Sequence, residues 1–160
     1  MPVGEMHLNC RVAFTEVVME KQTVAVNQKF ATDEGNVYDA FLDPKIASKF
    51  LFATPTGTMV QAEIDPRVGG RYTFVERRDE VDVEHTGEYL ELVRPLKIVF
   101  TFAVPMYSSE ISTVTMDIHA IGEGCEVTLQ NSDVLPEWAE RTREGWGKIL
   151  EKARDVLAPQ

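Results

Sequence analysis

The sequence predicts an α+β fold in which a curved, seven-stranded antiparallel sheet wraps around one long C-terminal helix. Apolar residues alternate with polar ones over successive segments, as in strands with one buried face. Two short stretches after the first of these segments carry apolar residues at helical spacing. From Pro136 onward the apolar period changes from that of a strand to that of a helix.

The N-terminal part of the chain predicts an extension, a strand and two short helices. Residues 1–15 have no clear period, so we expect an extension that precedes a single domain over 16–160. The Val- and Thr-rich segment 16–30 predicts the first strand. Thr32 or Asp33 can cap the first short helix. The apolar faces of the two helices are Val37, Tyr38, Phe41 and Leu42, and then, after Pro44, Ile46, Ala47, Phe50 and Leu51.

Six further strands follow, separated by turn residues and therefore expected to form a meander. Gly87 lies inside the longest of them and predicts a bulge or bend, and Gly122 to Gly124 predicts a tight hairpin. The expected ranges are 59–65, 71–78, 81–93, 97–104, 111–121 and a last strand from Cys125. The expected inward residues include Val60, Ala62, Ile64, Tyr72, Phe74, Glu76, Ile98, Phe100, Phe102, Val114, Met116, Ile118, Cys125, Val127 and Leu129.

The last segment predicts one long amphipathic helix packed on the sheet. A curved sheet closed by such a helix is a helix-grip architecture, and we expect a ligand pocket between the two layers. The apolar stripe of the helix is Trp138, Thr142, Gly145, Trp146, Ile149, Leu150, Ala153, Val156 and Leu157.

Composition narrows the range of partners and locations. The 160 residues carry a formal net charge of −10, which repels phosphate backbones and argues against nucleic-acid binding and against docking on anionic lipid. The N-terminus has no signal-peptide pattern and no run is apolar enough for a membrane span, so a cytoplasmic location is expected. Of the two cysteines, Cys125 is expected in the core and Cys10 in the extension as a free thiol.

Several motifs occur in the order found in one known family. They are the segment from Asp43-Pro44 to Lys49-Phe50, the run 65–74, the run 87–95 followed by 98–102, the run 124–129 and Glu144-Gly145-Trp146. Over residues 16–157 the chain resembles single-domain proteins related to the activator of the ATPase of the 90-kDa heat-shock chaperone. That family belongs to the START-like (SRPBCC) superfamily, which also includes polyketide cyclases and lipid-transfer domains.

The resemblance implies a START-like, helix-grip fold and leaves the activity open. The chain departs from the family pattern at Leu51, where Phe is common after Trp, and at Cys125, where Thr is usual. It also lacks the extra N-terminal domain with which the chaperone activators hold their partner. A chaperone partner and a role in the stress response therefore remain one implied alternative.

The residues expected to line the pocket share the concave face of the sheet or stand at the start of the long helix. Glu76 is expected to mark a polar spot with Arg78, unless the strand simply leaves the core there. His85 could face the pocket, with a core or surface position as the alternative, and His119 is expected on the outer face. The expected pocket residues are Tyr72, Phe74, Glu76, His85, Tyr89, Phe100, Phe102, Met116 and Trp138.

Motifs that carry known chemistry are missing from the sequence. There is no Walker pattern, no His-Glu-x-x-His and no Cys-x-x-Cys, so we expect no metal, no cofactor and no identifiable catalytic residue. Three functions remain: binding of a small hydrophobic or aromatic molecule, a cyclase- or aromatase-like enzyme, and a protein-interaction module. The first needs only a pocket, whereas the second needs an acid or base, for which Glu76 and His85 are the candidates.

Overall fold

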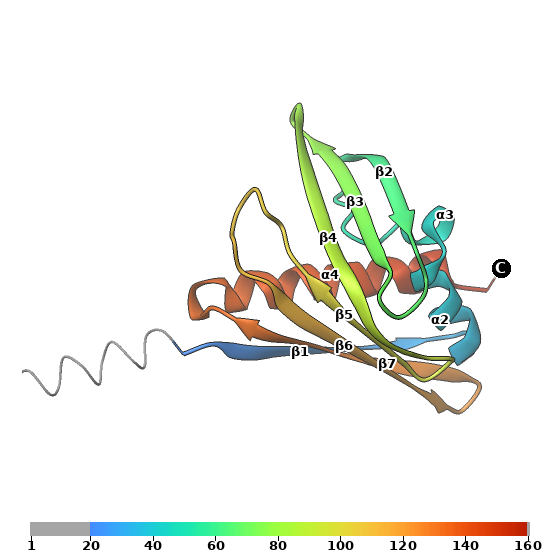
Figure 1. Cartoon of the computed structure of the whole chain (residues 1–160). Helices are drawn as coiled ribbons and strands as arrows, with labels where there is room; N and C mark the ends of the chain where they lie inside the picture. The colour runs from blue at the N-terminus through green and yellow to red at the C-terminus, as the bar shows by residue number, and fades with distance from the viewer. Residues whose placement is uncertain (1–19, 160) are drawn as a thin grey trace, which may run out of the picture.

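A computed structural model describes residues 20–159, so the expected extension over 1–15 and Cys10 lie outside the described residues. The seven-stranded antiparallel sheet has the order β1-β7-β6-β5-β4-β3-β2 (Figure 1). The predicted fold class is therefore confirmed. The strands are β1 (Gln22–Phe30), β2 (Thr58–Ile64), β3 (Arg71–Arg78), β4 (Val81–Val93), β5 (Lys97–Phe102), β6 (Ser112–Ile121) and β7 (Gly124–Val134).

Two short helices follow β1, and a long helix ends the chain. Helix α2 (Glu34–Leu42) is capped by Asp33, and Asp43 caps α3 (Pro44–Ala47) by accepting a hydrogen bond from the Lys45 N–H. A single turn of 3₁₀ helix, η1 (Pro136–Trp138), leads into α4 (Ala139–Val156). Figure 1 shows α4 lying across the sheet, with α2 and α3 near its C-terminal end.

Two hairpins have the turns that their residues predict. Asp79 and Glu80 connect β3 to β4 with φ angles of 50° and 69°, and Gly122 begins the β6–β7 turn at φ 54°. Consecutive left-handed residues fit the right-handed twist of paired strands, which explains the tight connection at Asp79 and Glu80. Because these turns are short, β3 to β4 and β6 to β7 pair in fixed register.

Gly87 lies where β4 passes close to β5. A Cβ atom there would lie 1.8 Å from the carbonyl oxygen of Thr101, so only glycine lets β4 approach β5 so closely. The glycine is therefore required for this close approach, while pairing with β3 continues in regular register through Gly87. The register shift in β4 lies further along, between Tyr89 and Glu91.

One predicted strand face was wrong. Val60 was expected to point inward with Ala62 and Ile64, but its side chain is 42% exposed. The register with β3 shifts between Met59 and Gln61, which is a bulge that reverses the side-chain alternation at that point. Met59 packs on the core instead of Val60.

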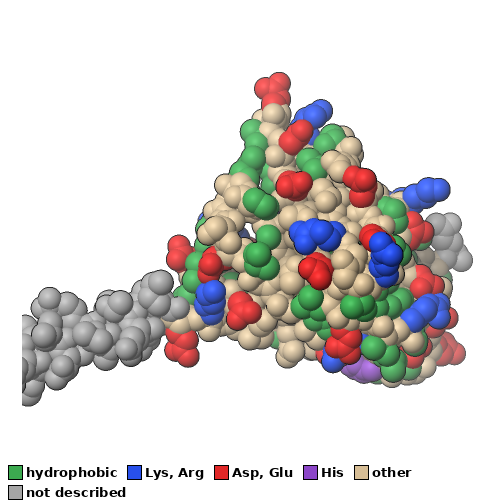
Figure 2. Space-filling model, in the orientation of Figure 1, with side chains coloured by type: hydrophobic (Ala, Val, Ile, Leu, Met, Phe, Trp, Pro, Cys, Tyr) green, Lys and Arg blue, Asp and Glu red, His purple; other side chains and the backbone are tan. Residues whose placement is uncertain are grey.

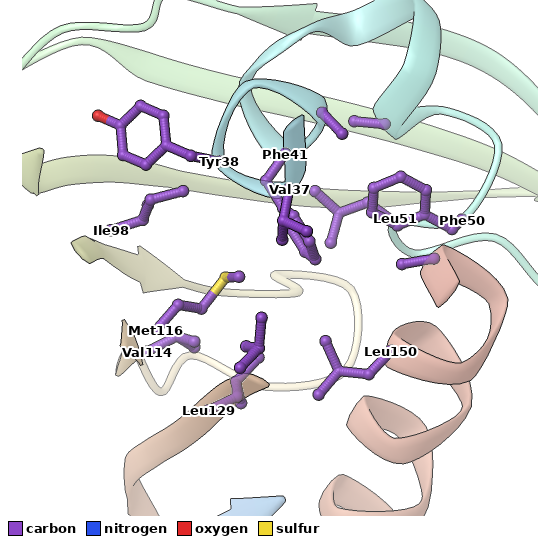
Figure 3. Close-up of a cluster of buried hydrophobic side chains, with 14 of the residues drawn as sticks. Val37, Tyr38, Phe41, Phe50, Leu51, Ile98, Val114, Met116, Leu129 and Leu150 are labelled. Carbon is purple, nitrogen blue, oxygen red and sulfur yellow. The ribbon is translucent and has the colours of Figure 1, made fainter. Parts of the chain in front are cut away.

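The closed part of the core lies between the sheet, α2, the segment after α3 and α4 (Figure 3). Phe50 and Leu51 follow α3 in a turn, outside the helix that was expected to carry them, yet both are buried. The inward faces predicted for β6 and β7 are confirmed. Fully buried members of this core include Val37, Phe50, Ile98, Val114, Met116, Leu129 and Leu150.

Candidate functional site: a cavity between sheet and long helix

A cavity of about 940 Å³ lies between the sheet and α4. Its wall is formed by the segment 48–57 after α3, by β3 and β4, by the loop after β5, by the end of β7 and by one face of α4. Tyr107 lies on this wall and is 59% exposed, so the cavity opens to solvent. A volume of this size is in the upper part of the range of small-molecule sites.

Phe52 is the centre of an aromatic cluster on the wall. Its ring stacks on His85 at 4.6 Å and on Phe102 at 5.3 Å between centroids, and meets Trp146 edge-on at 5.7 Å. The backbone of Phe52 has φ 60°, which is uncommon for an aromatic residue. Its carbonyl oxygen accepts a hydrogen bond from Nη2 of Arg78, which holds this conformation in place.

A buried ion pair forms the polar end of the cavity. Glu76 is 1% exposed, and its Oε1 accepts a hydrogen bond from Nε of Arg78. Its Oε2 accepts from the backbone N–H of Thr54 at 2.6 Å and from the Thr54 hydroxyl at 3.1 Å. Gly57 makes this approach possible, because a Cβ atom there would lie 2.4 Å from the Glu76 side chain. Each carboxylate oxygen thus accepts at least one hydrogen bond from within the chain.

His85 completes the polar end as an uncharged group. Burial, and then the nearby Arg78 charge, lower the pKa of His85 to about 4. The neutral ring has one N–H, and the contacts assign it to Nδ1, which faces the Phe74 carbonyl oxygen at 3.3 Å. Nε2 then accepts from Nη2 of Arg78 at 3.5 Å. A histidine with so low a pKa is a weak proton acceptor near neutral pH.

Asn131 is the third buried polar residue of the wall. Its Oδ1 accepts the indole N–H of Trp146 at 2.9 Å, and its Nδ2 donates to the Ser112 hydroxyl at 2.9 Å. This pair joins α4 to the end of β7 and satisfies the one polar atom of the Trp146 side chain. Trp146 therefore serves both the core and the cavity wall.

The structure brings four of the nine expected pocket residues to the cavity and places five elsewhere. Glu76, His85, Phe102 and Trp138 line it. The other five lie deeper, because α2 and the segment after α3 cover that part of the concave face. Tyr72, Tyr89 and Phe100 line a separate small void, and Phe74 and Met116 are packed in the core. Contact of a ligand with any of the nine remains a prediction.

Four residues of the cavity wall were either not identified from the sequence or expected in the core. Phe52 and Thr54 lie in a connection with no period, and Asn131 occupies an inward position of β7 where an apolar residue is usual. Trp146 was expected mostly in the core. Asn131 is a polar residue at an inward-facing position in the alternating pattern of its strand, and this was the one signal that could have pointed to it.

The remaining histidine and cysteine of the described segment do not belong to the cavity. His119 is exposed as predicted and lies 3.2 Å from Glu126 across the strand pair. Cys125 is buried, and burial raises the pKa of its thiol. Within residues 20–159 no group of His, Cys, Asp or Glu side chains has the arrangement of a metal site, and no helix is long and apolar enough to cross a membrane.

The acidic excess of the chain does not form a single patch on the face drawn in Figure 2, where acidic, basic and apolar side chains are interspersed. The cavity wall has the same mixture near solvent. Lys49, Arg141 and Lys152 lie on it together with Glu110 and Asp155. The outer wall therefore gives no strong preference for one sign of charge.

Comparison with solved structures supports the fold. A protein from Chromobacterium violaceum has a TM-score of 0.79 and 22% identity, over 86% of this chain and 98% of its own. A protein of unknown function from Staphylococcus aureus has a TM-score of 0.77 and 16% identity, over 88% and 96%. The AHSA1-like protein from Aeromonas hydrophila has a TM-score of 0.73 and 16% identity, over 84% and 91%.

Sequence comparison identifies the family. No curated protein matches the chain. The sequence model described as activator of Hsp90 ATPase homolog 1-like protein matches residues 31–158, from the end of β1 to beyond the end of α4. The match spans most of the chain and includes every element that borders the cavity. The chain therefore belongs to the family of activator of Hsp90 ATPase homolog 1-like proteins.

Proposed function

We propose that this protein binds a small hydrophobic or aromatic molecule in the cavity between the sheet and α4. The observation that carries the proposal is the cavity itself: about 940 Å³, with Phe52, Phe102 and Trp146 clustered on its wall. Aromatic walls with a few placed polar groups are typical of ligand sites.

Binding is favoured over catalysis by the state of the two candidate acid–base groups. Both oxygens of Glu76 accept hydrogen bonds from the chain, and His85 is uncharged with a pKa of about 4. The Glu76 oxygens are therefore engaged by the chain, and His85 is a weak proton acceptor because its pKa is low. A cyclase-like enzyme would lose its activity on Glu76→Gln, so turnover of an aromatic or polyketide-like substrate that this change abolishes would favour the enzyme instead.

A matched pair of glycines on α4 provides the test. Gly145 lines the cavity, whereas Gly147 does not, and an added Cβ atom meets nothing within 4 Å at either position. Gly145→Trp should fill part of the cavity, and Gly147→Trp should place the same side chain elsewhere on the helix. Both changes remove a helix-interior glycine, so neither should unfold α4.

The probe is N-phenyl-1-naphthylamine, a neutral aromatic amine that fluoresces in apolar surroundings. We expect saturable binding to the wild type and to Gly147→Trp, and at least roughly tenfold weaker binding to Gly145→Trp because the bulky ring excludes the probe. Equal binding by the two variants, or no saturable binding by the wild type, would contradict the proposal. Native mass spectrometry of the purified protein would show whether a small molecule stays bound.

A further inference from the structure

The polar end of the cavity differs from an ordinary charged site because its own charges cancel. Glu76 and Arg78 form an ion pair, and His85 is neutral beside them. These three groups thus contribute no net charge. A ligand that enters here meets hydrogen-bonding capacity rather than an unbalanced charge.

One donor of this group is still available. Arg78 uses Nε for Glu76 and Nη2 for Phe52 and His85, while its Nη1 has no hydrogen-bond partner among residues 20–159. In the same part of the chain no fully buried side-chain nitrogen or oxygen is left without a partner, so Nη1 is accessible. Arg78 lines the cavity, and 30% of its side chain is exposed.

The acceptors beside this donor each already accept at least one hydrogen bond from the chain. Glu76 accepts from Arg78 and Thr54, and Nε2 of His85 accepts from Arg78. The oxygen of Asn131, on the same wall, accepts from Trp146. A ligand hydroxyl placed here would find a donor for its oxygen, but its hydrogen would have to share an oxygen that already accepts a hydrogen bond from the chain.

A ligand carboxylate fits equally poorly. It would lose its hydration without meeting net positive charge, since Glu76 already neutralises Arg78. The outer wall does not compensate for this loss, because its basic and acidic side chains are mixed.

We propose that the cavity selects aromatic molecules that carry an uncharged carbonyl oxygen, which accepts a hydrogen bond from Nη1 of Arg78 while the ring packs on Phe52 and Phe102. A ketone or ester has an acceptor and no hydrogen that needs a partner. This inference rests on the proposed binding function and adds the chemical class of the ligand.

Three naphthalenes of similar shape test the class on the wild-type protein by titration calorimetry. They are 2-acetylnaphthalene, 2-isopropylnaphthalene and 2-naphthoate. We expect the ketone to bind at least about fivefold more tightly than the hydrocarbon and the carboxylate, because a hydrogen bond to a charged donor outweighs the cost of desolvating the carbonyl. A hydrocarbon that binds as tightly as the ketone, or a carboxylate that binds most tightly, would overturn the class but leave apolar binding intact. Failure of all three would count against the proposed function itself.

A matched arginine pair tests the donor. Arg78→Lys keeps a positive charge beside Glu76 but removes the planar fork, whereas Arg77→Lys makes the same change on the outer face of β3, where Arg77 pairs with Asp82. The ketone-to-hydrocarbon affinity ratio should fall at least about threefold in Arg78→Lys and stay unchanged in Arg77→Lys. An unchanged ratio in a folded Arg78→Lys protein would overturn the assignment of the donor. If that variant does not fold, the three-ligand comparison on the wild type still decides.

Discussion

Two neighbouring faces of α4 have different surroundings. One face, formed by Ala139, Trp146, Leu150 and Ala153, is buried in the core. The adjacent face, which includes Thr142, Gly145 and Ile149, borders the cavity, as does Trp138 in the preceding η1 turn. The helix supplies apolar residues to both, so the difference comes from what the rest of the chain places opposite.

The packed face meets side chains that fill the space, and the cavity face does not. Leu150 belongs to one cluster with Val37, Phe41 and Phe50, which α2 and the segment after α3 contribute (Figure 3). The cavity face meets Phe52 and the Glu76 network across open space. Apolar periodicity therefore identifies the face of a helix that turns toward the sheet. It does not show whether that face packs against other side chains or borders a cavity.

The largest effect is expected from the tryptophan that joins the two regions. Trp146→Ala should lower the free energy of unfolding by roughly 3–5 kcal/mol, since it leaves a core cavity and the unpaired oxygen of Asn131. Trp138→Ala should cost about 1 kcal/mol, because this partly buried ring packs on a smaller cluster and lies on the cavity wall. Denaturant melts would measure both. Equal denaturation midpoints for the wild type and Trp146→Ala would contradict the distinction between the packed face and the cavity face of α4.

Acid should weaken the cavity side through His85. The pKa of His85 is about 4 in the folded protein against 6.5 for the free side chain, so between these values the unfolded chain binds a proton that the folded chain does not. Stability should be independent of this group above about pH 6.5 and should fall by roughly 3 kcal/mol as the pH decreases to 4.

The control for this prediction is His85→Phe, which keeps a ring beside Phe52 but cannot titrate. Its stability should be lower near neutral pH, since the Phe74 carbonyl and Arg78 lose a partner. The difference between the two stability curves should shrink from pH 6.5 to 4, because only the wild type loses stability through His85, whereas the carboxylates titrate in both proteins and cancel. A constant difference would mean that folding does not lower the pKa of His85.

Breaking the ion pair at the polar end is expected to have a smaller effect. Glu76→Gln should cost about 2 kcal/mol, below the usual range for a fully buried pair because Arg78 keeps access to the cavity. Asp82→Asn removes the partner of the exposed Arg77 on the same hairpin and should cost much less. Urea titrations of the two variants check this order, and similar losses would show that the cavity end is as well solvated as the outer surface.

The smallest effect is expected from a substitution that adds atoms to α4 instead of removing them. Gly145→Ala should stabilise the protein by about 0.5–1 kcal/mol, since alanine favours a helix and a Cβ atom there meets open space. Ala153→Val on the packed face adds carbon where none is accommodated and should destabilise by about 1–3 kcal/mol. Thermal melts that move in the same direction for both would contradict the assignment of a filled and an unfilled face.

Much of the fold could be predicted from patterns of residue type. The order of the elements, the inward faces of β6 and β7 and the burial of Trp146 all follow from alternation or helical spacing. Turn residues located the hairpins at Asp79 and Gly122. Val60 was placed on the wrong face because a bulge adds a residue to the strand, and no periodic rule shows where that occurs.

The candidate site could be predicted less well. Alternation gives the side of the sheet on which a residue lies, but its depth depends on which other segments cover it. Tyr72 and Phe102 share the concave face, yet Tyr72 is in the core and Phe102 on the cavity wall. Phe52 and Thr54 reach the site from an irregular connection whose path no local pattern fixes.

The sequence by itself determined the helix-grip architecture and the family, because these depend on local periodicity and residue order, and it named Glu76 and His85 as candidates for the inner face. Tertiary structure alone decided which aromatic residues surround open space, and it decided that Glu76 and His85 are joined by Arg78 and Thr54 into one hydrogen-bonded group. The physical reason is that packing and hydrogen bonding join residues from distant segments: Thr54 lies 22 positions from Glu76, and Phe52 lies 26 positions from Arg78. Such contacts exist only after the chain has folded.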